Sequence, residues 1–172
     1  MKVLVCTVSD RAAQGIYEDL SGPAIETVLL EYNSGISIKR TIVPDEADAI
    51  RNAFLANMDS DIIITTGGTG LSPRDITPDV TASFCDRLIP GIAEYIRIES
   101  LKETPNAALS RGVAGIKNRT IIINLPGSPN AAGYCARLLT PIITHALSMM
   151  NGMGHGNGKG QNVLPTSKGF HR

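Results

Sequence analysis

The segment around residue 70 combines residue types that bind phosphate with residue types that bind a metal ion. Three glycines, Gly67, Gly68 and Gly70, are followed closely by Arg74 and Asp75. Glycine allows positive φ and close approach of the backbone, so successive amides can point at an anion. The carboxylate adds a hard oxygen ligand of the kind that Mg²⁺ prefers. The combination predicts phosphoryl or nucleotidyl transfer, although a tight strand-to-helix turn would also use these glycines.

A second loop offers another anion site later in the chain. Asn124 and Pro126 lead into Gly127 and Ser128, and Pro129 then stands where the first residue of a helix is expected. Proline suits the first helical position, and the amides at a helix N-terminus attract anions. The loop is therefore predicted to hold a second phosphate group.

Charged side chains elsewhere complete the candidate chemistry. Arg11 and Arg111 join Arg74 as cations that could form bidentate contacts with phosphate. Asp45 joins Asp75 as a candidate magnesium ligand. Both aspartates also have a structural interpretation, Asp45 as a helix cap and Asp75 as a cap of the turn into the next helix. One residue can serve both purposes.

Composition excludes several classes of protein. A chain of 172 residues is most simply one domain, and its 16 basic and 16 acidic residues leave no basic face for nucleic acid. Cys6, Cys85 and Cys135 match no metal-binding spacing and are compatible with a reducing compartment. The N-terminus begins a strand directly, which predicts no signal peptide, and no long apolar run predicts a membrane span. We therefore expect a cytoplasmic protein that binds neither nucleic acid nor membrane.

Apolar runs alternate with amphipathic segments along the chain. Strands are expected at 2–8, 36–43, 62–64, 109–116 and 119–124, the last two forming a hairpin around 117–118. Helices are expected at 21–32, from Asp45, from Thr77, after 90–91, and from 129 to about 150 with a break at 140–141. Ser21, Asp45, Thr77 and Ser128 are the expected caps.

Strand–helix alternation predicts the fold class α/β, a three-layer sandwich with helices on both faces. Its central sheet is expected to be mostly parallel with one antiparallel hairpin. Four loops, at Ser9–Asp10, Pro44–Asp45, the glycine segment and Pro126, would then meet at one edge of the sheet. We assign residues 1–151 to this domain and residues 152–172, rich in Gly and Asn, to a flexible tail.

Several segments together resemble the Mog family of molybdopterin adenylyltransferases, whose domain is shared with gephyrin-type G domains. The matching segments follow one another in family order and are 8–12 with Gly15, 43–46, 65–70, 74–79, 109–111 and 124–129. The resemblance implies transfer of AMP from ATP to the terminal phosphate of molybdopterin, with Mg²⁺ and release of pyrophosphate. It also implies that Asp45 and Asp75 are the functionally essential aspartates and that the protein is a homotrimer.

Residue chemistry and resemblance together select a set of substrate- and nucleotide-binding positions. The set is Ser9, Asp10, Arg11, Gly67, Gly68, Thr69, Gly70, Ser72, Arg74, Ser110, Arg111, Asn124, Pro126, Gly127 and Ser128. The alternatives are a binding protein of the same fold with little or no turnover, a scaffold protein, and the multidomain molybdenum-insertion enzyme. The chain has no room for the extra domains of that enzyme, which could instead be a downstream partner.

Overall fold

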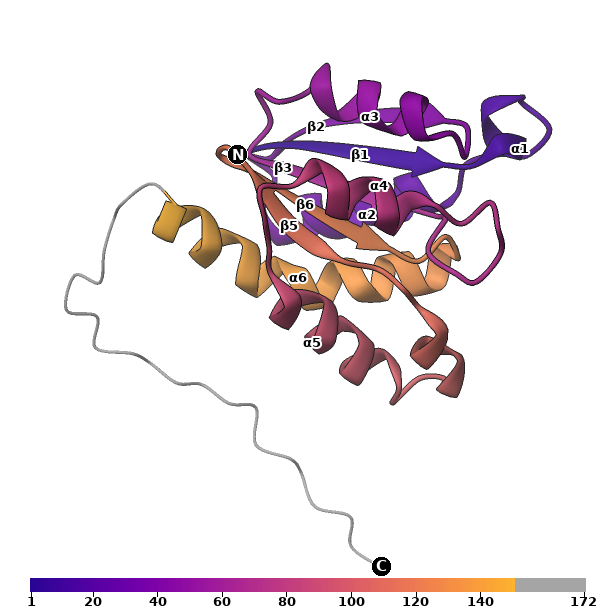
Figure 1. Cartoon of the computed structure of the whole chain (residues 1–172). Coiled ribbons are helices and arrows are strands. Elements are labelled where there is room, and N and C mark those ends of the chain that lie inside the picture. The colour runs from indigo at the N-terminus through magenta and orange to yellow at the C-terminus, as the bar shows by residue number, and fades with distance from the viewer. Residues whose placement is uncertain (151–172) are drawn as a thin grey trace, which may run out of the picture.

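The computed structural model describes residues 1–150, so residue 151 and the predicted tail at 152–172 lie outside the described residues. A six-stranded sheet with the order β2-β1-β3-β6-β5-β4 forms its centre (Figure 1). Four strands run parallel, namely β1 (Lys2–Val8), β2 (Ser37–Val43), β3 (Ile62–Thr66) and β6 (Thr120–Leu125). β5 (Ala114–Lys117) pairs antiparallel with β6 and with the short β4 (Arg87–Leu88). The predicted fold class is confirmed.

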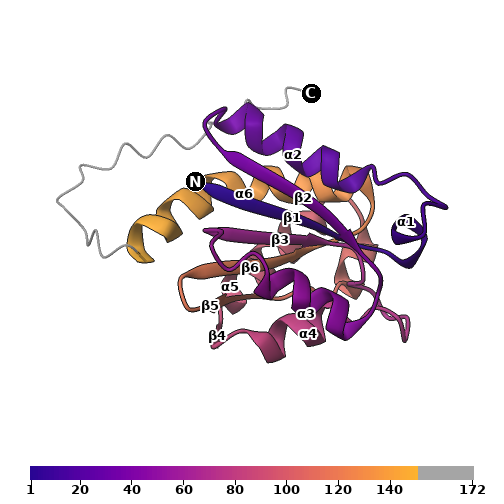
Figure 2. The same ribbon diagram turned by 90° about the horizontal axis from the view of Figure 1, so that it is seen from above.

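Helices cover both faces of the sheet, as Figure 2 shows for α2 and α6 on one side and α3 and α4 on the other. The first face carries α2 (Ser21–Tyr32), α5 (Pro90–Ser100) and α6 (Pro129–Met150). The second carries α3 (Ala47–Leu55) and α4 (Thr77–Phe84). Within residues 1–150, each helix is too short or too polar to cross a membrane.

The centre of the sheet is apolar on both faces. Ile62–Ile64 of β3 lies in register beside Ile121–Ile123 of β6, and these side chains are at most 1% exposed. Alternate residues of each strand point into the two separate cores under the two helix layers. Continuous apolar runs are expected where a parallel strand is covered on both faces. The two central strands therefore give a rigid base for the loops that follow them.

Two predicted boundaries are wrong. The predicted strand at 109–116 begins only at Ala114, because residues 105–109 form a short 3₁₀ helix (η1, Pro105–Leu109) capped by the Thr104 side chain. The predicted break at 140–141 is absent, and α6 continues through Pro141. Thr140 Oγ1 donates to Arg137 O at 2.9 Å, which satisfies the carbonyl that lacks a partner at a proline.

Three expected caps do not cap a helix by their side chains. Ser21 is the first residue of α2, and Asp19 Oδ1 accepts from the amides of Ser21 and Gly22 instead. Thr77 is likewise the first residue of α4 and makes no capping hydrogen bond. The N-cap position of α3 is Glu46, which leaves Asp45 free of that role. Ser128, the fourth expected cap, does directly precede a helix, because α6 begins at Pro129. The backbone oxygen of Ser128 accepts from Ala132 N at 2.8 Å.

Candidate functional site

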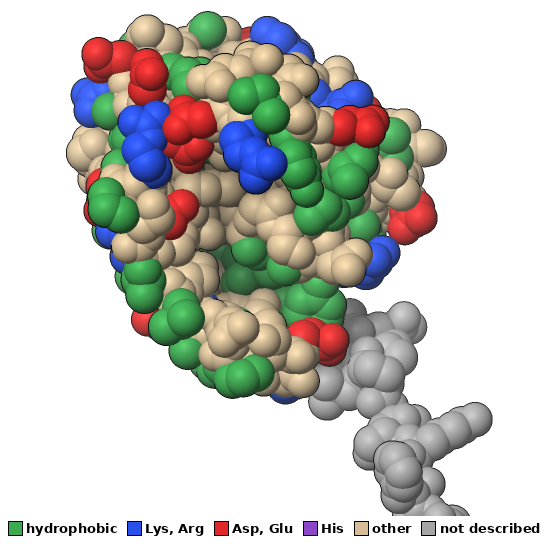
Figure 3. Space-filling model, turned by 90° about the vertical axis from the view of Figure 1, so that its right-hand side faces the viewer, with side chains coloured by type: hydrophobic (Ala, Val, Ile, Leu, Met, Phe, Trp, Pro, Cys, Tyr) green, Lys and Arg blue, Asp and Glu red, His purple; other side chains and the backbone are tan. Residues whose placement is uncertain are grey.

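Four loops meet at the carboxyl edge of the parallel strands, as predicted. The strands β1, β2, β3 and β6 lead into α1 (Asp10–Ala13), the 44–46 turn, the glycine loop (residues 67–70) and the 126–128 loop. Parallel strands deliver their following loops to one edge of a sheet, where ligands bind in open α/β folds. Figure 3 looks onto this edge and shows a hollow with acidic and basic side chains grouped beside it.

The glycine loop separates two cavities. The polar cavity, of about 350 Å³, is lined by Gly67 and Gly68 together with Asp45 and Asp75. Its other predicted lining residues are Ser9, Arg11 and Gly127. The apolar cavity, of about 250 Å³, is lined by the second half of the glycine loop, Thr69 and Gly70, and by Ser110, Pro126, Ile96, Arg97, Leu109 and Cys135. The predicted site is thus divided between two chemically different spaces.

The first two glycines of the loop are required by protein packing. Gly67 and Gly68 have φ of 98° and 62°, in the left-handed region that favours glycine. A Cβ at Gly67 would collide with Val8 O, and one at Gly68 would collide with the Thr77 side chain. Their spacing predicted either close approach of a ligand or a tight strand-to-helix turn. The structure shows that close approach of neighbouring protein segments already demands them.

The glycine loop also contacts the other proline-bounded loop. A Cβ at Gly127 would lie 3.1 Å from Gly67 Cα, so the two backbones pass close to each other. Thr66 Oγ1 donates to Pro126 O at 2.7 Å and holds the two loops together. The two predicted anion-binding loops therefore form one continuous backbone surface.

The two candidate catalytic aspartates lie against the glycine loop. Asp45 Oδ2 accepts from Asp10 N at 2.8 Å, and Asp75 Oδ2 accepts from Ser72 N at 2.8 Å. Within residues 1–150, no donor reaches the second oxygen, Oδ1, of either carboxylate. The interpretation of Asp45 as the cap of α3 is therefore wrong, whereas Asp75 does cap the turn that leads into α4, since Asp75 N also donates to Ser72 O at 2.9 Å. Each carboxylate has an oxygen available for a ligand.

Electrostatics distinguish Asp45 from its neighbour Asp10. Burial raises the pKa of Asp45, and the negative charges of Asp10 and Asp75 add to that rise. By contrast, the hydrogen bonds from the Arg74 guanidinium hold the pKa of Asp10 below its ordinary value. A cation that entered the polar cavity would therefore stabilise the ionised form of Asp45.

Two of the three candidate arginines are paired with carboxylates. Arg74 forks onto Asp10, with Nε at 3.1 Å from Oδ2 and Nη2 at 2.8 and 2.6 Å from Oδ1 and Oδ2. Arg111 forks onto Asp79 at 3.1 and 2.9 Å. Only Arg11 lines the polar cavity, and its guanidinium carbon stands 4.8 Å from the centre of the Tyr17 ring.

Arg111 fastens the glycine loop to α4. Its Nε donates to Gly70 O at 3.0 Å, its backbone amide donates to Thr69 O at 2.9 Å, and its Nη2 donates to the carbonyl of Asp75. The Arg111 side chain thus holds one loop carbonyl and the carbonyl of a candidate catalytic residue, and its backbone amide holds a second loop carbonyl. The geometry gives Arg111 a supporting role in this structure.

Six predicted residues line neither cavity, namely Asp10, Ser72, Arg74, Arg111, Asn124 and Ser128. Asn124 is 4% exposed. Its side chain donates hydrogen bonds to Thr65 and Thr81 and accepts one from the amide of Val113, and these bonds hold together the elements that carry the site. Ser128 faces a separate groove between α2, α5 and α6.

Asp19 is the main lining residue that sequence reasoning missed. It lines the polar cavity, and its Oδ2 accepts from Thr7 Oγ1 at 2.9 Å while its Oδ1 caps α2. An aspartate two positions before an expected helix start is a capping signal that could have revealed it. Because Asp19 satisfies the amides at the start of α2, that helix terminus is closed to phosphate by its own cap.

The chain is similar to several known proteins in sequence and in fold. The family model described as "Probable molybdopterin binding domain" matches residues 4–145. A molybdopterin adenylyltransferase of Helicobacter pylori is 44% identical over 152 residues, which cover 86% of each chain. Gephyrin of Dictyostelium discoideum is 38% identical over 158 residues, 86% of this chain and 22% of that protein. The crystal structure of the molybdopterin biosynthesis enzyme MoaB from Thermus thermophilus is 42% identical, with a TM-score of 0.79 over 88% of this chain and 96% of that one.

Proposed function

The chain belongs to the molybdopterin-binding domain family, and on that premise we propose that it is a molybdopterin adenylyltransferase of molybdenum cofactor biosynthesis. It transfers AMP from ATP to the terminal phosphate of molybdopterin. The observation that carries this proposal is the pair of aspartates, Asp45 and Asp75, which line one cavity together with Gly67 and Gly68 of the glycine loop. Carboxylates beside a phosphate-binding backbone suit chemistry between two anions that need a cation between them.

The reaction consists of one displacement at phosphorus. An oxygen of the molybdopterin phosphate attacks the α-phosphorus of ATP and forms a new P–O bond. The bond from the α-phosphorus to the α,β-bridging oxygen breaks, and pyrophosphate leaves with the electron pair. The products are adenylylated molybdopterin and pyrophosphate, so atoms and charge balance without any further reactant.

The two cavities suit the two ends of these substrates. We assign the triphosphate to the polar cavity, which is lined by Ser9, Arg11 and Gly68. The Gly67 amide donates to Leu125 O at 3.2 Å, so Gly67 shapes the wall of this cavity rather than offering its amide. We assign the flat pterin to the apolar cavity, beside Ile96 and Leu109, because apolar walls favour a ring system over water. The glycine loop between the cavities is then the place where the two phosphates meet.

The donor set fits Mg²⁺ shared with a substrate. Within residues 1–150, no three His, Cys, Asp or Glu side chains gather to hold a metal by themselves. Mg²⁺ is usually bound by one or two carboxylates together with substrate phosphates and water, and Asp45 and Asp75 each have an oxygen without a donor. When bound, Mg²⁺ would supply positive charge that offsets the repulsion between the two anionic substrates.

Arg111 and Asn124 act by holding the loops. Arg111 fixes the carbonyls of the glycine loop, and Asn124 joins the strands β3 and β6 to α4. Rigid placement of the backbone matters because misplacement by about 1 Å can cost roughly 100-fold in rate. These residues therefore belong to the site although they line neither cavity.

We propose a homotrimer in the cytoplasm whose product is handed to the molybdenum-insertion enzyme. Support for self-association comes from apolar side chains left exposed on and just after α5, with Ile98 59% and Leu101 47% exposed. Light scattering should give about three times the 18.2 kDa of one chain. A stable monomer at micromolar concentration would contradict the trimer.

The decisive experiment measures pyrophosphate release from ATP with and without molybdopterin. Adenylyl transfer predicts release only when molybdopterin is present, together with formation of adenylylated molybdopterin. The alternative function, a binding protein of the same fold, predicts molybdopterin binding without pyrophosphate release. Release from ATP alone would contradict both functions, because it would mean simple hydrolysis.

A further inference from the structure

Asp10 lies outside both cavities, yet it contacts Asp45 through two hydrogen bonds. Asp45 Oδ2 accepts from Asp10 N at 2.8 Å, and Asp10 Oδ1 accepts from Asp45 N at 2.9 Å. Each aspartate therefore holds the backbone amide of the other. The two residues are 35 positions apart, and the paired bonds join the loop after β1 to the loop after β2.

This arrangement decides which oxygen of Asp45 is available. Its Oδ2 is turned toward α1, and its Oδ1 is turned toward the glycine loop, 3.1 Å from where a Cβ of Gly68 would lie. A carboxylate held at one oxygen and at its own backbone has little freedom to rotate. The oxygen that faces the polar cavity is thus selected by contacts with Asp10.

Arg74 reduces the electrostatic repulsion between Asp10 and Asp45. Two carboxylates in contact repel each other unless a cation neutralises one of them. The Arg74 guanidinium contacts both Asp10 oxygens at 2.6 to 3.1 Å, including Oδ1, which also accepts from Asp45 N. The charge of Asp10 is therefore balanced before any substrate arrives.

We propose that Asp10 is a positioning residue that orients the Asp45 carboxylate toward the polar cavity, and that Arg74 enables this by neutralising Asp10. The proposal rests on the proposed adenylyl transfer, because it assigns Asp10 a task in that reaction. It replaces the expectation that Asp10 binds substrate. Both Asp10 oxygens are already engaged, Oδ1 by Asp45 N and Arg74, and Oδ2 by Arg74.

Two substitutions of Asp10 separate positioning from direct binding. Asp10→Asn keeps an oxygen that can accept from Asp45 N, whereas Asp10→Ala removes it. We expect kcat for pyrophosphate release to fall about 100-fold in the alanine variant. In the asparagine variant we expect a fall of no more than about fivefold, because a neutral acceptor replaces a charged one. The KM for molybdopterin should change little in either.

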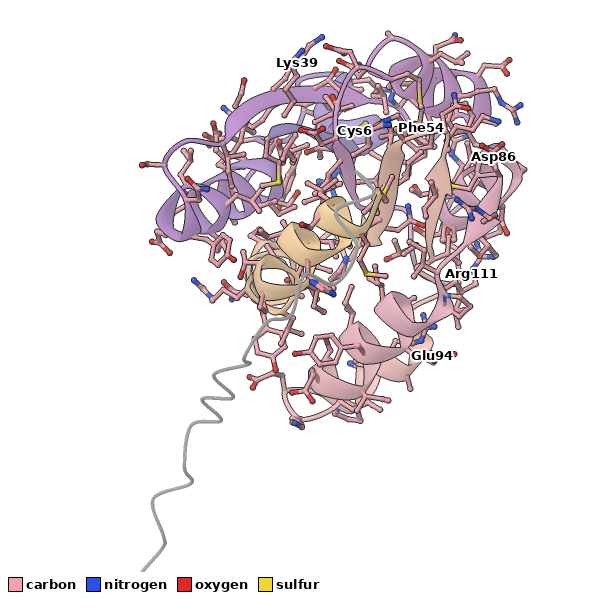
Figure 4. The ribbon with its side chains drawn as sticks, turned by 90° about the vertical axis from the view of Figure 1, so that its left-hand side faces the viewer. Cys6, Lys39, Phe54, Asp86, Glu94 and Arg111 are labelled. Atoms are coloured by element: carbon pink, nitrogen blue, oxygen red, sulfur yellow. The ribbon has the colours of Figure 1, made fainter. Side chains whose placement is uncertain are left out.

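Asp86→Ala is the matched control. Asp86 also accepts from a backbone amide, Asn118 N at 2.9 Å, and also pairs with a cation, Lys117 Nζ at 2.7 Å. It lies past the opposite end of α4 from Arg74 and Asp75 and lines neither cavity. Asp86 is labelled in Figure 4, which views the molecule from the side opposite to that of Figure 3. If Asp86→Ala lowered kcat as much as Asp10→Ala, the loss would reflect general stability and the proposal would be overturned.

A second readout does not depend on turnover. Mn²⁺ binding to the protein with a non-hydrolysable α,β-methylene ATP analogue can be measured by electron paramagnetic resonance. Affinity should fall about tenfold in Asp10→Ala and remain near that of the wild type in Asp10→Asn. Equal losses in both variants would mean that the Asp10 carboxylate itself binds metal or substrate. Unchanged affinity in Asp10→Ala would also overturn the proposal.

The role of Arg74 is tested by rescue. Arg74→Gln leaves the charge of Asp10 unbalanced beside Asp45 and should lower kcat, and adding Asp10→Asn should restore most of it. Failure to restore would overturn the neutralising role. If the wild-type protein released no pyrophosphate, the proposed function would fail, while the Mn²⁺ comparison would still decide whether Asp10 positions Asp45.

Discussion

The polar and apolar cavities share one wall but differ in what makes that wall. On the polar side, the Gly67–Gly68 backbone faces three aspartates and Arg11, which come from the segments after β1, β2 and β3. On the apolar side, Thr69 and Gly70 face α5 and η1, which supply the aliphatic side chains of Ile96, Ala107 and Leu109. A glycine backbone can serve both sides because it presents amides without adding bulk. Carboxylates therefore line only the polar one of the two cavities.

The largest effect should come from the carboxylates of the polar cavity. Asp45→Asn and Asp75→Asn keep the side-chain shape but remove the charge that would bind Mg²⁺. Adenylyl transfer should fall by a factor on the order of 10³, since metal clamping contributes several kcal/mol to such transition states. Molybdopterin affinity should stay the same or rise slightly. Pyrophosphate release and molybdopterin binding should be measured for both variants, with Asp86→Asn as control.

The comparison between the cavities would fail if Asp45→Asn or Asp75→Asn lost molybdopterin binding but kept normal turnover of bound substrate. That result would place the pterin, not the triphosphate, beside the aspartates.

Filling the apolar cavity should affect one substrate only. Ala107→Leu adds bulk beside Leu109 and Ser110, and it should raise the KM for molybdopterin about tenfold while the KM for ATP changes little. Ala56→Leu, at the exposed C-cap of α3, is the control for a change of the same size. Steady-state kinetics with each substrate varied in turn would test this. An equal rise in both KM values would mean that the two cavities act as one.

The wall itself can be tested by a graded set of glycine substitutions. Gly67→Ala combines positive φ with a collision against Val8 O, Gly15→Ala has positive φ in open space, and Gly91→Ala has neither. Unfolding free energy should fall by about 3 kcal/mol, about 1 kcal/mol and close to zero, respectively. Chemical denaturation would measure the series. Equal stability of all three variants would show that the loop can move away from Val8.

The smallest effect concerns the rim of the polar cavity. Tyr17 is 58% exposed and lies under the Arg11 guanidinium, a contact worth about 0.5–1 kcal/mol at an exposed position. Tyr17→Ala should raise the KM for ATP about threefold and leave the KM for molybdopterin unchanged. Tyr32→Ala, on α2 away from both cavities, should change neither value. A larger effect on molybdopterin would assign Tyr17 to the other substrate.

Local sequence patterns were sufficient to predict most helices and strands, because each of these is formed by one continuous segment of the chain. The apolar runs of β1, β3 and β6 and the helical spacing of α2 and α5 predicted the parallel sheet and its two helix layers. Errors arose where a local rule was satisfied by an unexpected partner. Pro141 remains inside α6 because Thr140 takes over the hydrogen bond to Arg137 O, and α2 is capped by Asp19 rather than by Ser21.

The sequence by itself determined the glycine loop, the candidate aspartates and the family, because these depend on residue types at fixed short spacings. Tertiary structure alone decided how those residues are used. Asp10 meets Asp45 across 35 positions, Arg74 meets Asp10 across 64, and Arg111 meets Gly70 across 41. Such pairings follow from the order of strands in the sheet, which brings distant loops to one edge. No local pattern encodes which carboxylate an arginine will reach there, and so the division into two cavities emerged only from the folded chain.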